Sequence, residues 1–182
     1  PATFQEAGQI LGSGGVTPEW AGRRIFYTGD VQFEDQTLIP GASFPIDKVD
    51  TLIIETTRGE SPRPEGFRRA DEEARFARVI RETIERGGAV LIPVFAMGKT
   101  QEVLTMLHSF KCQGSIPDAP IRIGGLGTKM TVLFDELADH TPRNNPGFKI
   151  FDQLDVETGS RNHEPIPCLA GTIYALSSGM MT

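Results

Sequence analysis

The sequence predicts an α/β fold with a mostly parallel sheet. Short apolar runs typical of strands alternate with segments whose apolar residues recur every three or four positions, as on one face of a helix. At residues 87–104 such a run passes through a glycine turn directly into a helical segment, as expected of an α/β protein. In addition, 38% of the 182 residues are hydrophobic, which is enough for a core in one domain or two small ones.

The first two predicted strands are apolar runs that end in acidic side chains. Residues 24–28 precede Asp30, and residues 51–55 end in Glu55 itself. Ligands tend to gather at the carboxyl ends of strands in sheet-based enzymes, so both carboxylates are candidate site residues. Strand ends are also often polar for no functional reason, and this alternative stays open.

The rest of the chain alternates between helices and strands. A helix is predicted where Phe76, Ile80 and Ile84 share one face, and Gly87 ends it. Along the rest of the chain, proline and glycine residues mark the boundaries between predicted helices and strands. In chain order, the other strands are predicted at 89–95, 120–123, 149–151 and 172–176, the other helices at 99–110 and 128–139, and irregular segments at 36–47, 58–66 and 153–169.

Gly98, Lys99 and Thr100 reproduce the end of a phosphate-binding loop. The first glycine of that pattern is replaced by Pro93, which lacks an N–H and has a restricted φ. Nucleotide hydrolysis is therefore disfavoured, but the amides at the helix N-terminus could still bind an anion. The alternative is a plain junction without a ligand, between a buried strand at residues 89–95 and a helix.

Net charge and composition disfavour several classes of protein. The net charge of −6 argues against a nucleic-acid-coating protein but is compatible with a local cationic patch. Arginines are frequent between residues 58 and 86, where glutamates at helical spacing favour ion pairs over phosphate contacts. No apolar run approaches the roughly 20 residues that span a bilayer, and the N-terminus is not a secretory signal. A cytoplasmic protein without membrane contact is expected.

The cysteines and histidines do not suggest a metal site of their own. Cys112 and Cys168 are isolated and are expected to be buried thiols rather than a disulfide. His108, His140 and His163 lack the spacing of zinc ligands.

Six sequence segments occur in a characteristic order. They are AGQILGS (7–13), YTGD (27–30), DTLIIETTRGE (50–60), VLIPVFAMGKTQEVL (90–104), GGLGTKMT (124–131) and LSSGMMT (176–182). Together they resemble the β-CASP branch of the metallo-β-lactamase superfamily, which includes zinc-dependent ribonucleases.

The resemblance implies a two-part fold. Residues 1–60 correspond to the C-terminal part of a metallo-β-lactamase αββα sandwich, and residues 61–182 to the inserted α/β (β-CASP) domain, with the active site between them. The first metal motif of the family, His-x-His-x-Asp-His, is absent. The chain therefore resembles a fragment, expected to be inactive alone and not to hold the two zinc ions of the complete enzyme.

The resemblance also assigns roles to three residues near the N-terminus. Asp30 matches the carboxylate that bridges the two zinc ions, where a shared anion offsets their repulsion. Gln9 stands where the family usually has a zinc-binding histidine, and an amide oxygen is a much poorer zinc donor than imidazole. Glu55 matches the acidic residue that orients a catalytic histidine further along the family's sequence. A natural loss at Gln9, an engineered change and a shifted alignment are all left open.

Two groups of residues are expected to bind substrate phosphates. Lys99 and Thr100 begin a predicted helix, and Ser177, Ser178 and Gly179 follow the last predicted strand. Both turns should lie at the carboxyl edge of a parallel sheet and could converge on one phosphate. The resemblance thus implies a zinc-dependent phosphodiester hydrolase acting on RNA. The alternative is a non-catalytic RNA- or partner-binding protein that keeps the fold, and its oligomeric state is left open.

Overall fold

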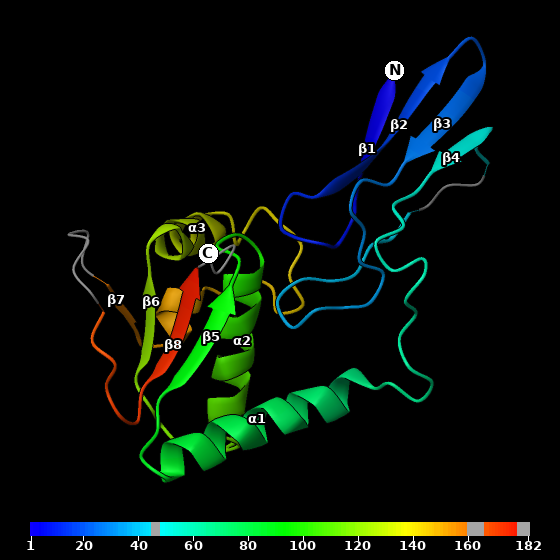
Figure 1. The fold of residues 1–182 in the computed structure, drawn as a ribbon. Coiled ribbons are helices and arrows are strands. Elements are labelled where there is room, and N and C mark those ends of the chain that lie inside the picture. Colours follow the sequence, from blue (N-terminus) through cyan, green and yellow to red (C-terminus); the bar gives the residue numbers. More distant parts are fainter. Residues whose placement is uncertain (45–47, 160–165, 178–182) are drawn as a thin grey trace. The chain divides into compact units, whose positions relative to one another are not determined.

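The computed structural model describes residues 1–44, 48–159 and 166–177 (Figure 1). Its contacts divide the chain into two compact units. The first contains Pro1–Pro64 and Thr141–Asn144, and the second contains Glu65–His140 and Asn145–Thr182. A short segment from the middle of the second unit's sequence therefore belongs to the first. None of the helices in the described ranges is long and apolar enough to cross a membrane.

The first unit contains a four-stranded sheet in the order β1-β2-β3-β4. The strands are β1 (Ala2–Glu6), β2 (Gly14–Trp20), β3 (Arg23–Tyr27) and β4 (Thr51–Ile53). The first three are antiparallel, whereas β3 and β4 run parallel. The strands predicted at residues 24–28 and 51–55 are confirmed. The sequence pattern missed β1 and β2, because β1 holds a single large apolar residue and β2 begins with two glycines.

The long loop after β3 packs on this sheet through aromatic side chains. Phe26 of β3 packs edge-to-face on Phe44, with ring centroids 4.8 Å apart, and Phe33 meets the same ring at 5.9 Å. Leu38 and Ile39 of this loop are also buried. These aromatic contacts hold the loop against β3, the strand that precedes Asp30.

The second unit is built around a fully parallel sheet in the order β5-β8-β6-β7. In Figure 1 the red strand β8 lies between β5 and β6. The predicted α/β class with a parallel sheet is confirmed for this unit. The elements are α1 (Arg69–Glu85), β5 (Val90–Val94), α2 (Lys99–Cys112), β6 (Ile121–Gly124), α3 (Leu126–Glu136), α4 (Ile150–Gln153), β7 (Val156–Thr158) and β8 (Ile173–Ser177).

The core of the second unit lies between its central strands and α2. Leu104 and Leu107 of α2 are completely buried, as are Ile121, Ile123 and Ile173 of the sheet. β-Branched residues suit the central strands, and the leucines lie on the inner side of the helix. Both α2 and α3 pack on β8. Each helix directly follows a strand of the parallel sheet, β5 or β6, so their N-termini lie at the same edge of the sheet.

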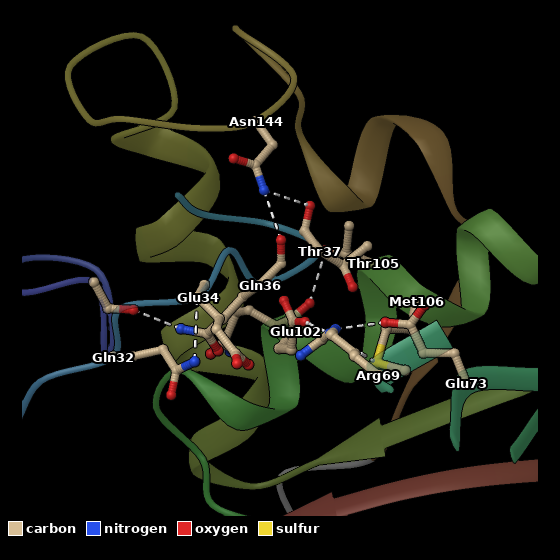
Figure 2. Close-up of polar contacts among 12 residues, drawn as sticks. Gln32, Glu34, Gln36, Thr37, Arg69, Glu73, Glu102, Thr105, Met106 and Asn144 are labelled. Carbon is tan, nitrogen blue, oxygen red and sulfur yellow. Dashed lines mark hydrogen bonds and ion pairs between the residues drawn. The ribbon is translucent and has the colours of Figure 1, made fainter. Parts of the chain in front are cut away.

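The arginine-rich helix α1 is held by ion pairs. Arg69 contacts Glu73 one turn further along and Glu102 of α2, each at 2.6 Å (Figure 2). Arg81 donates to the carbonyls of Gly114 and Ser115 just after α2. These contacts support ion pairing and helix packing for the arginines named here, rather than a phosphate-binding surface.

Several expectations were wrong. Residues 149–151 begin α4 instead of a strand, because the Asp135 carboxylate accepts bonds from the Ile150 and Phe151 amides at 2.8 and 2.9 Å and so favours a helical turn. β7 lies in the segment expected to be irregular. Cys112 and Cys168 are exposed, not buried.

The strand before the Gly98 turn is not buried either. Among the strands that the structure describes, β5 pairs only with β8 and is therefore an edge strand, with Leu91 61% exposed. Pro93 fits this position because an edge strand can lack an N–H on its unpaired side. The same proline that disfavours a phosphate-binding loop thus also indicates the edge of the sheet.

Candidate functional site

Asp30 and Glu55 follow two neighbouring parallel strands. Tyr27 is paired with Ile53 at the ends of β3 and β4, and the Thr28 amide donates to the Ile53 carbonyl at 3.0 Å. Both carboxylates therefore emerge at the same edge of the sheet, as the sequence predicted. Their catalytic roles stay predictions.

The Glu55 carboxylate is used to hold the backbone beside Asp30. Its Oε1 accepts a bond from the Val31 amide at 3.0 Å, and its Oε2 accepts one from the Thr57 amide at 3.1 Å. The Thr57 side chain and then these two amides lower the pKa of Glu55, because each hydrogen bond favours the charged form. The ionised carboxylate thus ties the turn after β3 to the turn after β4. Asp30 itself is exposed.

The loop that carries Gln9 is held by several hydrogen bonds. The Gln9 and Ile10 amides both donate to the Ser13 Oγ, at 3.1 and 3.2 Å, and the Ala7 amide donates to the Ser13 carbonyl. From the opposite side, the Gln36 Nε2 donates to the carbonyls of Gly8 at 2.7 Å and Gln9 at 2.8 Å. The backbone of residue 9 is thereby bonded at both its N–H and its carbonyl.

Gly8 allows this loop to approach the loop after β3 closely. Its φ is +69°, and a Cβ there would lie 2.4 Å from the Ala42 nitrogen and 2.5 Å from the Gln32 oxygen. Any other residue would clash with this backbone. The Gln32 amide also donates to the Ala7 carbonyl at 2.9 Å. The loop that carries Gln9 and the loop after β3 are therefore in close backbone contact.

A cavity of about 360 Å³ opens next to the same loop. Its walls are largely apolar and include Ile10, Leu11, Ile39, Pro40 and Pro142. Such a lining does not suit a phosphate or a metal ion, so we assign neither to it.

Zinc does not fit the described residues by themselves. Within residues 1–44, 48–159 and 166–177, no group of three or more His, Cys, Asp or Glu side chains is placed to hold a metal ion. Asp30 offers one carboxylate, and the Gln9 side chain offers an amide, which is a much poorer zinc donor than an imidazole. His108 instead lies against the Phe148 ring, with centroids 5.3 Å apart, and His163 lies outside the described residues.

In the second unit, the strands that precede the two predicted anion-binding turns end at the same edge of the sheet. Val94 at the end of β5 is paired with Ser177 at the end of β8. Lys99 is the first residue of α2, which follows β5. Ser178 and Gly179 lie outside the described residues, so the convergence on one phosphate stays a prediction.

The helix start is less open to an anion than the sequence indicated. The Gly98 amide donates to the Gln101 Oε1 at 2.7 Å, and the Thr100 amide donates to the Phe95 carbonyl at 3.0 Å. Thr100 is fully buried, and its hydroxyl also donates to the Phe95 carbonyl at 2.9 Å. Its side chain stabilises the turn, so we leave it out of the substrate site and keep Lys99.

Sequence reasoning missed two buried glutamines. Gln101 is completely buried, and its Nε2 donates to the Ala96 carbonyl at 3.1 Å and to Thr131 of α3 at 2.9 Å. Its position three residues after Gly98 is that of a capping-box side chain, which was a usable signal. For Gln36 no local pattern existed, because its partners lie 27 and 28 residues away.

Similarity to known proteins identifies the family. A segment of 132 residues is 43% identical to an RNase J-like protein of Methanocaldococcus jannaschii, covering 72% of this chain and 31% of that protein. The transcription termination factor FttA of the same organism is 37% identical over 136 residues, 72% of this chain and 21% of the factor. The chain belongs to the β-CASP branch of the metallo-β-lactamase superfamily.

A further β-CASP relative is eukaryotic. Cleavage and polyadenylation specificity factor subunit 3 of Dictyostelium discoideum is 40% identical over 108 residues, 59% of this chain and 14% of that protein. No protein-family model matches the chain. The β-CASP chain spans less than a third of the length of these curated relatives, and their family is metal-dependent.

Proposed function

We propose that this β-CASP chain is part of a zinc-dependent hydrolase that cleaves phosphodiester bonds in RNA. The observation that carries the proposal is that Asp30 and Glu55 follow the paired ends of β3 and β4, and that Glu55 bonds the backbone next to Asp30. Both residues stand at positions that resemble site residues of the family. The names of the relatives, an RNase J-like protein and a polyadenylation factor, support RNA as the substrate.

The family fold supports an assignment for each unit. We assign residues 1–60 to the C-terminal part of the metallo-β-lactamase sandwich and residues 61–182 to the inserted β-CASP domain. The cytoplasm is the proposed location, and RNA the proposed partner.

The residues of this chain would position the site and supply charge for binding RNA. We assign no catalytic step to zinc, because the described residues do not fit a zinc site by themselves. Glu55, held ionised, keeps the turn after β3 in place and so defines the backbone position from which the exposed Asp30 side chain extends. Lys99 would attract the phosphate backbone at the carboxyl edge of the second sheet. Ser177, Ser178 and Gly179 stay proposed substrate contacts.

Replacing Asp30 tests the proposal. In the full-length protein, Asp30→Asn keeps the shape of the side chain and removes its charge, so we expect hydrolysis of a labelled RNA to fall on the order of 100-fold. Asp118→Asn is the matched control, because Asp118 is an exposed carboxylate in the other unit. Equal RNA hydrolysis by the wild type and Asp30→Asn would contradict the proposed role.

Gln9 favours a second candidate function. A protein that kept the β-CASP fold but lost a metal ligand would bind RNA, or a protein partner, without cleaving it. The full-length wild type distinguishes the two functions, because the second predicts RNA retention on a filter with no shortening of the RNA.

A further inference from the structure

Position 9 combines a strongly held backbone with a side chain that makes no hydrogen bond to the described residues. The Gln9 N–H is bonded to Ser13 and its carbonyl to Gln36. The side chain is partly exposed, and residue 9 is not among those with a positive φ. A histidine can therefore replace Gln9 and keep both backbone bonds, without needing a positive φ.

We propose that loop 7–13 is an intact frame for a metal ligand, that only the Gln9 side chain has lost the ability to bind the metal, and that Gln36 is the positioning residue of this frame. The inference rests on the proposed metal-dependent function. It differs from that function at one residue, because the Gln9 side chain does not suit zinc. A carboxamide oxygen is a weak zinc donor, whereas an imidazole on the same backbone is a strong one.

Gln36 has no freedom to turn its amide. The residue is only 7% exposed, and both acceptors of its Nε2 are backbone carbonyls, so the nitrogen must face the Gln9 loop. The backbone N–H of Gln36 donates to the Ile39 carbonyl at 3.0 Å. A glutamate at this place would set a carboxylate against two carbonyl oxygens and would push the Gln9 loop away.

Gln36 is in turn held by the segment Thr141–Asn144. The Asn144 Nδ2 donates to the Gln36 carbonyl at 2.6 Å, and the Asn144 amide donates to the Leu38 carbonyl at 3.1 Å (Figure 2). Figure 2 shows the Asn144 side chain directed toward Gln36 and Thr37. A chain of bonds thus leads from Asn144 through Gln36 to residue 9.

The test measures zinc in the full-length protein after dialysis and needs no RNA. We expect Gln9→His to hold about one more zinc ion per chain than the wild type, whereas Gln9→Ala should hold no more than the wild type. Adding Gln36→Glu to Gln9→His should weaken the affinity for that zinc about 10- to 100-fold, the usual effect of losing a residue that orients a ligand.

A matched control separates positioning from general destabilisation. Asp135→Asn, added to Gln9→His, is also an isosteric change at a buried side chain that bonds two backbone groups, but it lies in the other unit. It should leave the zinc affinity unchanged. Should Gln36→Glu prevent folding, Asn144→Ala releases the Gln36 carbonyl without changing Gln36 and should lower the affinity in the same direction.

Three results would overturn the inference. The first is a wild type that holds as much zinc as Gln9→His, and the second is a Gln9→His variant that gains none. The third is an equal loss of affinity from Asp135→Asn and Gln36→Glu. Because hydrolysis is not measured, these results are independent of the proposed action on RNA, which can fail while the gain of zinc is observed.

Discussion

At the candidate site, the side chains of Glu55 and Gln36 form hydrogen bonds to backbone groups. Glu55 uses both carboxylate oxygens on amides of the turns after β3 and β4, and Gln36 uses its amide nitrogen on two carbonyls of the Gln9 loop. The backbone at Asp30 and Gln9, the residues proposed for metal-ligand positions, is held by these neighbours. Motifs were enough to propose the ligand positions, whereas no motif indicated the backbone hydrogen bonds of the supporting residues.

The pH dependence of stability tests the bonds of Glu55. Its pKa is lowered below the ordinary value of 4.5, so its contribution to stability is present above that value and is lost as the pH falls through the folded-state pKa. In urea unfolding at pH 7, we expect Glu55→Gln to cost on the order of 1 kcal/mol after allowance for solvent screening. The cost should shrink at pH 3.

Glu60→Gln is the control, since Glu60 is an exposed carboxylate of the same unit. It should change stability little at either pH. A difference between the wild type and Glu55→Gln that grows on acidification would show that the carboxylate is not held in its charged form.

Elements of the second unit are joined at their ends by Gln101. This side chain bonds the turn before α2 through Gly98 and Ala96, and it bonds α3 through Thr131. The strand–turn–helix order was predictable from periodicity, because periodicity is local. The edge position of β5 was not, because it depends on which strands pair.

Removing the Gln101 amide should destabilise the junction of α2 and α3. Gln101→Leu leaves the Gly98 amide and the Ala96 carbonyl without their partner in a buried site, so we expect a loss of about 1–3 kcal/mol in urea unfolding. Gln113→Leu is the control, because Gln113 is exposed after α2 and its side chain bonds only Ser109. Equal stability of the two variants would refute the role of Gln101 as a structural link.

On the scale of the whole molecule, RNA binding should depend on the carboxyl edge of the second sheet. In the full-length protein, Lys99→Ala should weaken binding of a short single-stranded RNA several-fold at low salt. The slope of log affinity against log salt concentration should also decrease, by about the amount that one phosphate contact contributes. Lys111→Ala, at the other end of α2 and paired with Asp118, should not. Equal affinity and salt dependence for Lys99→Ala and the wild type would remove Lys99 from the proposed site.

The sequence by itself determined the alternation of strands and helices, the placing of Asp30 and Glu55 after strands and the exclusion of a phosphate-binding loop by Pro93. Each of these depends on the conformational preferences of neighbouring residues. Only the tertiary structure decided that Gln36 holds the Gln9 loop and that Asn144, 108 residues further along, holds Gln36. It also decided that both cysteines are exposed. Hydrogen bonds between distant segments, and the burial that goes with them, exist only once the loops have packed, so no local pattern could have indicated them.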